Sequence, residues 1–367
     1  MKITHVAEYA SGGVATYLRN TIAYQLDCDD IETIDLFISN FNSENINFNS
    51  EKFRIHRYDY HRNIKGIIQL LKIVPDIVKV KSDVIHFHST FAGLLRPFIK
   101  FASWKQKVLI VYTSHGWSFF KEDIGNFQKV IFIIIENILS YFTNLIINVS
   151  RHDYPISTKY GISKKKSTFI YNTIKPEVKP LPVKNPFTKV NTYKICFIGR
   201  FDKAKGLDFL LNSFDFDHSN IEIMIIGKAV LNDAQINTSN TEHIHFVGWI
   251  NNNELDSYIR LCDAVVIPSR WEAFGLTALE AMKNSKLVIS SNAGGLPEIV
   301  KTGYNGFVFQ KEDKYSLIAT LKKFQKLDSK DIDIMDQHAH QTFIKKFNYE
   351  KNNADLIKIY EDGVKNA

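Results

Sequence analysis

The chain has 367 residues, of which 45% are hydrophobic and 23% are charged, and its formal net charge is +7. This length exceeds one comfortable core, so two domains are expected, and the composition excludes a disordered protein. The three cysteines offer neither a disulfide framework nor metal-ligand spacing, and we expect small buried side chains in a reducing compartment. No secretory signal is expected either, because Lys2 is followed by a short strand-like run.

Positive charge is concentrated in the first half of the chain. Residues 1–185 hold 24 Lys and Arg against 16 Asp and Glu, a net charge of +8, and the remainder has a net charge of −1. The stretch 94–107 interleaves cations with aromatic residues, and residues 164–166 form a second cationic cluster. Either a peripheral membrane surface or the solvated rim of a core-facing helix explains this pattern. Nucleic acid is not expected, because no DNA- or RNA-binding motif accompanies the charge.

Apolar runs alternate with segments of helical spacing, which is typical of parallel α/β folds. In the first half, helices are expected at residues 14–24 and 64–80, and Pro75 is expected to break or kink the second. Strands are expected at residues 2–7, 34–39, 84–88, 108–113 and 145–149.

Residues 130–149 are long and apolar enough to span a bilayer. Glu136, Asn137 and Asn144 would then lie inside the membrane, where an acidic residue costs roughly 2.5–3.5 kcal/mol. A helix to about Phe142 followed by a buried strand explains the same residues, and we predict that arrangement.

Residues 175–186 contain four of the nine prolines and are predicted to form an interdomain linker. The alternation then restarts. Helices are expected at 207–214, 254–261, 315–324 and 349–360, and strands at 193–199, 221–227, 244–247, 264–267, 287–290 and 307–309.

The most informative stretch is residues 268–282, in which Glu272 lies in a loop after an apolar strand and Glu280 lies on the following helix. A strand, a glycine-bearing loop and a helix N-terminus together make an anion site. Carboxylates there would repel phosphates, so they must bind hydroxyl-rich parts of a ligand, such as a ribose and a sugar. The pattern therefore suggests a nucleotide sugar.

Arg200 and Lys205 follow the strand that ends at Gly199, where ligands bind in open α/β sheets. A guanidinium and an ammonium can neutralise a departing pyrophosphate without a metal. Asp-x-Asp letters occur at residues 27–29, 215–217 and 331–333, but each lies at a helix end or in a polar connection. We therefore expect no metal and no cofactor besides the nucleotide sugar.

At these residues the chain resembles the retaining GT-B glycosyltransferases of family four. Further motifs occur in the expected order, at residues 11–14, 112–119, 169–173, 294–298 and 303–306. Two positions depart from the family pattern: Thr173 follows Asn172 where glycine is usual, and Ala273 follows Glu272 where Gly or Pro is usual.

The resemblance implies two Rossmann-like parallel-sheet domains that face a central cleft. Residues 1–180 would form the acceptor-binding domain and residues 190–344 the nucleotide-sugar-binding domain. A final helix at about 345–367 would cross back to the first domain.

The resemblance also implies roles for individual residues. The candidate catalytic residues are His115, Arg200, Lys205 and Glu272. The candidate donor-binding residues are Gly13, Asn172, Gly199, Arg200, Lys205, Val247, Trp249, Ile250, Glu272, Phe274, Gly275, Leu276, Thr277 and Glu280. His86 and His88 are assigned to opposite faces of their strand, and neither is expected to have a function.

The leading hypothesis is a metal-independent, retaining glycosyltransferase of capsule or O-antigen assembly. It would transfer a UDP-linked hexose or N-acetylhexosamine to an undecaprenyl-diphosphate-linked saccharide at the inner face of the cytoplasmic membrane. A sugar-nucleotide 2-epimerase, which shares the fold, and a non-catalytic lectin-like protein are the alternatives. A nicotinamide dehydrogenase is not expected, because neither Gly199 nor Gly227 opens a G-x-G-x-x-G loop.

Overall fold

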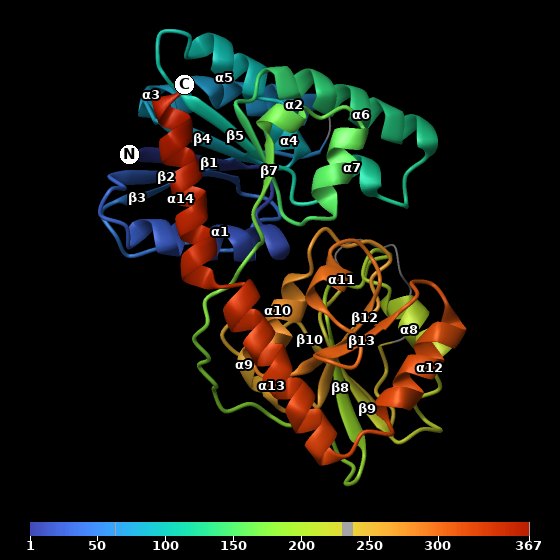
Figure 1. Cartoon of the computed structure of the whole chain (residues 1–367). Helices are drawn as coiled ribbons and strands as arrows, with labels where there is room; N and C mark the ends of the chain where they lie inside the picture. Colours follow the sequence, from blue (N-terminus) through green and yellow to red (C-terminus); the bar gives the residue numbers. More distant parts are fainter. Residues whose placement is uncertain (63, 230–237, 367) are drawn as a thin grey trace. The chain divides into compact units, whose positions relative to one another are not determined.

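Two compact units, each built on one parallel sheet, make up the protein (Figure 1). The computed structural model describes residues 1–62, 64–229 and 238–366. The first unit comprises Met1–Ile174 and Tyr349–Ala367, and the second comprises Lys175–Asn348. Parallel strands joined through helices confirm the predicted α/β class, with two Rossmann-like domains.

The sheet of the first unit has seven strands in the order β3-β2-β1-β4-β5-β6-β7. All neighbouring pairs are parallel. The strands are β1 (Lys2–Ala7), β2 (Thr33–Ser39), β3 (Phe53–Tyr58), β4 (Val84–His88), β5 (Leu109–Thr113), β6 (Leu145–Asn148) and β7 (Ser167–Phe169). The five predicted strands are all present. The edge strands β3 and β7 were missed, because edge strands are only partly buried and lack a continuous apolar run.

Helices surround this sheet, and the C-terminal helix α14 (Tyr349–Lys365) packs against α1 and β5 (Figure 1). The helix is interrupted between α2 and α3, just before Pro75, as predicted. The other helices are α1 (Gly13–Leu26), α2 (Ile64–Lys72), α3 (Val74–Val80), α4 (Thr90–Gly93), α5 (Arg96–Ala102), α6 (Asn126–Tyr141) and α7 (Asp153–Lys159), with 3-10 turns η1 (Ser118–Phe120) and η2 (Lys164–Lys166).

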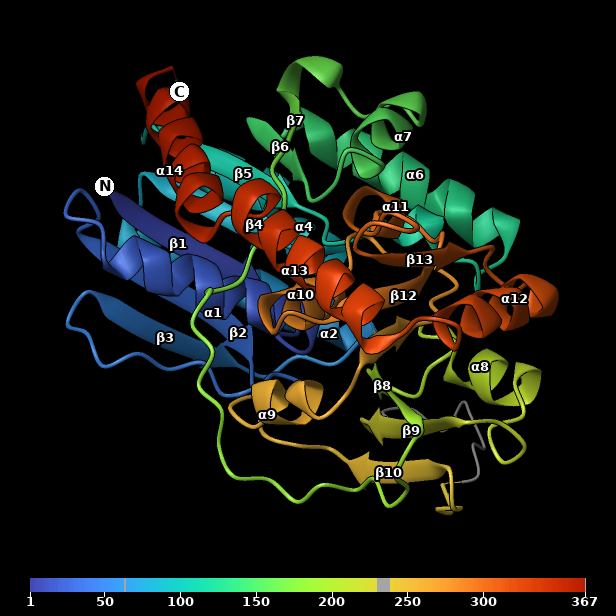
Figure 2. The same cartoon turned by 60° about the horizontal axis from the view of Figure 1, so that its bottom comes forward.

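The sheet of the second unit has the order β10-β9-β8-β11-β12-β13, and Figure 2 shows β8, β9 and β10 side by side. Its strands are β8 (Tyr193–Ile198), β9 (Ile221–Ile226), β10 (Ile244–Gly248), β11 (Ala264–Ile267), β12 (Leu287–Ser291) and β13 (Gly306–Phe309). Strand order reverses between β8 and β11, which is where open α/β sheets bind ligands.

The helices of the second unit follow the predicted alternation, with two additions. They are α8 (Leu207–Ser213), α9 (Leu255–Arg260), α10 (Leu276–Lys283), α11 (Leu296–Ile299), α12 (Lys314–Phe324) and α13 (Ser329–Lys346). Helices α11 and α13 were not predicted. Helix α11 has only four residues. Helix α13 is mostly polar, and only Ala339 and Phe343 are buried, so its apolar periodicity is weak.

The apolar stretch 130–149 forms helix α6 and strand β6, as predicted. Glu136 lies inside the unit, where its carboxylate accepts hydrogen bonds from Arg96 Nη2 at 2.8 Å and from the Tyr112 hydroxyl at 2.6 Å. Arg96 is fully buried, so it is not one of the surface cations that residues 94–107 were expected to supply. In the part of the chain that the structure describes, no helix is long and apolar enough to cross a membrane.

The buried ion pair gives a stability prediction. Replacing Arg96→Met should lower the free energy of unfolding by about 3–5 kcal/mol, because the Glu136 charge would remain buried without its cation. Urea denaturation followed by circular dichroism measures this change. The double variant Arg96→Met/Glu136→Gln keeps an acceptor for Tyr112 and should recover most of the loss. A single variant as stable as the wild type would contradict the assignment.

Candidate functional site

The loop between β11 and α10 places the two glutamates as the sequence predicted. Glu272 lies in the loop, and Glu280 lies on α10, which begins at Leu276. Gly275 precedes the helix with φ 109°, and Leu276 and Thr277 form its first turn. Backbone N–H groups in the first turn of a helix have no acceptor within the helix and point away from its N-terminus. This end of α10 therefore favours an anion.

Lys205, in the loop after β8, contacts Glu272. Its Nζ atom lies 2.6 Å from Oε2 of Glu272, and the Ser269 hydroxyl lies 3.4 Å from the same oxygen. Both partners are partly buried, with side-chain exposures of 25% for Lys205 and 15% for Glu272. The structure thus brings together a cation and a carboxylate from two different strand ends.

Arg200 belongs to the same loop as Lys205 but is more exposed. Its guanidinium pairs with Asp202 Oδ2 at 2.8 Å, and 45% of its side chain is accessible. Gly199, between β8 and Arg200, donates its N–H to the carbonyl of Ile226 at 3.0 Å. The start of this loop is therefore anchored to the neighbouring strand β9.

Arg270 fastens the two loops to each other, a role that the sequence analysis missed. Its guanidinium binds both carboxylate oxygens of Asp208, at 2.7 and 2.8 Å, and Glu312 Oε1 at 2.7 Å. The guanidinium also donates to the carbonyl of Lys203 at 2.9 Å. The backbone N–H of Arg270 donates to the carbonyl of Ala204 at 2.8 Å. The signal was an arginine that follows a buried strand within the glutamate motif, with Asp208 in the first turn of α8.

Two glycines permit the close approach of these loops. A Cβ atom on Gly206, at φ 69°, would lie 2.1 Å from the carbonyl oxygen of Pro268. A Cβ atom on Gly294, at φ 50°, would lie 1.6 Å from the carbonyl oxygen of Glu272. Any other residue would push the loops apart. The absence of a side chain at Gly294 therefore lets its backbone pack directly against the backbone of Glu272.

The remaining donor-binding candidates of the second unit differ in what they can contact. Phe274 is buried against Phe347, with ring centroids 5.6 Å apart, so only its backbone can face a ligand. Trp249 is 52% exposed, and Lys228 Nζ lies 5.3 Å from the centre of its ring. The neighbouring candidates lie in β10 or just beyond it: Val247 and Ile250.

Two donor-binding candidates belong to the first unit. Gly13 begins helix α1, and Asn172 lies in the segment that follows β7. The N–H of Gly12 donates to Glu44 Oε1 at 2.7 Å, so a carboxylate already occupies the start of this helix. Arg19 pairs with the same carboxylate. Asn172 is buried and lines a small cavity together with side chains of α1 and α14.

His115 lies two residues after the end of β5 and has a strained backbone, with φ 52°. A non-glycine residue in this region is held there by its surroundings, which is common at functional sites. Its Nε2 atom lies 2.9 Å from Nδ1 of His88, and its ring meets Tyr17 edge-on at 4.6 Å between centroids. Burial lowers the pKa of His115 to about 3, so the ring is neutral near pH 7.

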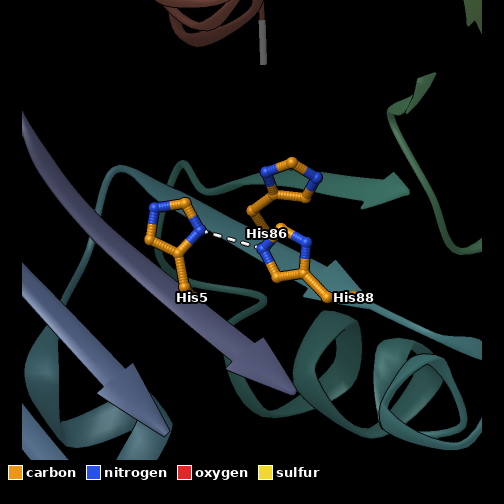
Figure 3. A group of neighbouring side chains, drawn as sticks. All are labelled: His5, His86 and His88. Carbon is orange, nitrogen blue, oxygen red and sulfur yellow. Dashed lines mark hydrogen bonds between the residues drawn. The ribbon is translucent and has the colours of Figure 1, made fainter. Parts of the chain in front are cut away.

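The assignment of His86 and His88 to opposite faces of their strand was wrong. Side chains two positions apart in a strand share a face. Their ring centroids lie 4.1 Å apart, and both rings are fully buried. Figure 3 shows that His5 from β1 joins them in one cluster.

Comparison with known proteins identifies the family. Residues 11–178 match the model Glycosyltransferase Family 4, and residues 183–342 match Glycosyl transferases group 1. An uncharacterized 41.2 kDa protein in the cps region of Klebsiella pneumoniae is 32% identical over 87% of this chain and 88% of the relative. The UDP-Gal:alpha-D-GlcNAc-diphosphoundecaprenol alpha-1,3-galactosyltransferase of Escherichia coli is 24% identical over 83% of this chain and 81% of that enzyme.

Solved structures share the fold. Sucrose-phosphate synthase from Thermosynechococcus elongatus aligns with a TM-score of 0.81 at 18% identity, over 100% of both chains. Anabaena HepE in complex with UDP and glucose aligns with a TM-score of 0.77 at 16% identity, over 99% of this chain and 100% of HepE. The chain therefore belongs to the group 1, family 4 glycosyltransferases and has their GT-B fold of two Rossmann-like domains.

Proposed function

We propose that this protein is a retaining glycosyltransferase that transfers a hexose or N-acetylhexosamine from a UDP-linked donor to a lipid-linked saccharide. The observation that supports this most directly is the contact between Lys205 and Glu272 beside the N-terminus of α10. One spot there offers a cation, backbone N–H groups and carboxylates. These are the groups needed for a diphosphate flanked by two hydroxyl-rich rings.

In the donor complex, the cations and N–H groups would bind the diphosphate, and the carboxylates would bind hydroxyl groups. Lys205 and the first turn of α10, at Leu276 and Thr277, would bind the diphosphate. Arg200 would leave its contact with Asp202 to join them. Glu280 would accept hydrogen bonds from the ribose hydroxyls. The base would lie against residues 247–250, next to the exposed ring of Trp249.

The chemical step separates charge, and the site suits that separation. The leaving diphosphate gathers negative charge, so Lys205 and Arg200 stabilise the transition state more than the bound donor. The two cationic side chains would take the place that a divalent metal has in other transferases. Glu272 already binds Lys205, which makes its carboxylate a weak nucleophile. Its role would be to bind a sugar hydroxyl and to stabilise positive charge at the anomeric carbon, with attack and departure on one face of the sugar.

Two relatives support the acceptor assignment. The E. coli galactosyltransferase acts on GlcNAc-diphosphoundecaprenol, and the Klebsiella relative lies in a cps region. An undecaprenyl-diphosphate-linked saccharide in the assembly of a capsule or O-antigen is therefore the proposed acceptor. Such an acceptor is embedded in the membrane, so the enzyme must reach the inner face of the cytoplasmic membrane.

The first unit has a surface that fits an anionic membrane. Helices α5 and α6 and the turn after α5 present an apolar face, which consists of Phe98, Phe101, Trp104, Phe127, Val130, Ile131, Ile134, Ile138 and Tyr141. The two helices are linked by contact of the Phe101 ring with Phe142, 5.7 Å between centroids. Exposed lysines accompany the apolar face at positions 100, 105, 107, 164 and 165. Apolar rings with flanking lysines are typical of interfacial membrane binding.

Site variants test the proposed donor chemistry. Arg200→Met and Lys205→Met should each lower kcat with a UDP-sugar and a polyprenyl-diphosphate-linked acceptor by roughly 10²–10³-fold, because each removes a cation from the leaving group. Lys203→Met, an exposed neighbour in the same loop, is the matched control and should leave kcat unchanged. Product formation is followed by mass spectrometry in the presence of a chelator, and NMR determines the anomeric configuration of the product.

A double variant adds a sharper measure. Lys205→Met leaves the Glu272 carboxylate beside the diphosphate without its cation, so Lys205→Met/Glu272→Gln should bind UDP more tightly than the single variant. Calorimetric titration with UDP measures both. Full activity in Lys205→Met, inversion at the anomeric carbon, or conversion of a UDP-sugar to its 2-epimer without acceptor would reject the proposal.

The membrane surface is tested with vesicles. Phe101→Ser/Trp104→Ser should weaken binding to anionic phosphatidylglycerol vesicles by at least roughly tenfold, because two large apolar side chains no longer enter the interface. Tyr315→Ser removes an equally exposed aromatic residue of the second unit and is the control. Co-sedimentation with anionic and with neutral vesicles is the measurement. Equal sedimentation of all three proteins, or none of the wild type, would contradict the assignment.

A further inference from the structure

Three histidines and a glutamine form a continuous hydrogen-bonded chain inside the first unit. Gln25 Oε1 lies 2.8 Å from Nε2 of His5, and Nδ1 of His5 lies 2.9 Å from Nε2 of His88. Nδ1 of His88 in turn lies 2.9 Å from Nε2 of His115. Figure 3 shows the central contact, between His5 of β1 and His88 of β4. This series of hydrogen bonds runs from Gln25, near the end of α1, to His115, two residues after the end of β5.

The imidazoles of this chain are neutral. Burial lowers the pKa of His5 to about 4 and that of His115 to about 3, and it lowers the pKa of His88 well below its ordinary value. A neutral imidazole has one donor nitrogen and one acceptor nitrogen. Each ring must therefore donate from one nitrogen and accept at the other, so all the hydrogen bonds in this series point the same way.

The orientation of the Gln25 amide sets that direction. Its oxygen faces His5, and an amide oxygen only accepts, so Nε2 of His5 is protonated and Nδ1 of His5 is the acceptor. His88 must then donate from Nε2 and accept at Nδ1, where Nε2–H of His115 donates. The Nδ1 atom of His115 is left with its lone pair. Among the described residues it has no hydrogen-bond partner, and the ring is only partly buried.

We propose that Gln25, His5 and His88 are positioning residues that hold His115 as the Nε2–H tautomer, with Nδ1 as a fixed acceptor for a hydroxyl group of the sugar substrate. The identity of the substrate rests on the proposed function, whereas the tautomer does not. In this state His115 selects a hydroxyl that donates to it. It offers neither a positive charge to a phosphate nor a donor to a carbonyl.

The hydrogen bonds also argue against a metal in the same place. His5, His86 and His88 each offer a nitrogen, and these atoms lie within 4.8 Å of one another. However, both nitrogens of His86 are bound, to the hydroxyls of Tyr360 at 2.5 Å and Thr113 at 2.8 Å. Both nitrogens of His5 and of His88 are used in the chain. A metal would have to displace the proton between His5 and His88.

NMR of the ¹⁵N-histidine-labelled full-length protein tests the proposal directly. Two-bond ¹H–¹⁵N correlations distinguish the tautomers, and the spectrum of His115→Gln identifies the signals of His115. We expect Nε2 of His115 to be protonated and Nδ1 to be bare at neutral pH. A protonated Nδ1, or a stoichiometric metal bound to the purified protein, would overturn the proposal.

Variants of Gln25 separate positioning from mere packing. Gln25→Met removes the acceptor at the start of the chain, so the signals of His115 should shift toward a mixture of tautomers, and the KM for the sugar substrate should rise roughly tenfold with a smaller change in kcat. His86→Gln, next to these hydrogen bonds but outside them, is the control that should leave the tautomer unchanged. An unchanged tautomer in Gln25→Met would overturn the proposal. If no substrate is turned over, the spectra still determine the tautomer of His115. A failure of this proposal can therefore be told apart from a failure of the proposed function.

Discussion

In each unit all strands are parallel, so their carboxyl ends lie at one edge of the sheet, and the loops that follow them meet there. The site depends on this constraint. It brings Lys205 after β8 and Glu272 after β11 to within 2.6 Å, although they are 67 positions apart in the sequence. The bonds of Arg270 to Asp208 then hold the two loops together. Polar groups are thereby fixed before a ligand arrives, which is what electrostatic stabilisation of a leaving group requires.

The positions of the inner strands and of the two glutamates could be predicted, because their signals are local. Strands that are buried on both faces appear as short apolar runs, and the inner strands of both sheets were predicted to within one or two residues. Glu272 and Glu280 follow such a run directly, so their placement in a loop and on a helix needed no tertiary information. The break at Pro75 follows from the missing N–H of proline in the same way.

Features that depend on distant partners were not predictable. Arg96 was expected among surface cations, yet it is buried because Glu136, 40 positions away, supplies its counter-charge. The bonds of Arg270 to Asp208 could not be predicted without knowing that strands β8 and β11 are neighbours. The histidine cluster joins His5 to His88 across 83 positions. The shared face of His86 and His88, by contrast, follows from the strand period of two and needs no distant partner.

The most direct measurement of the central claim is a crystal structure of the protein with an intact UDP-sugar. The diphosphate should lie within hydrogen-bonding distance of Lys205 Nζ and of the first turn of α10. The ribose hydroxyls should contact Glu280. A nucleotide bound away from the carboxyl ends of β8 and β11, or a diphosphate that contacts neither Lys205 nor Arg200, would contradict the account.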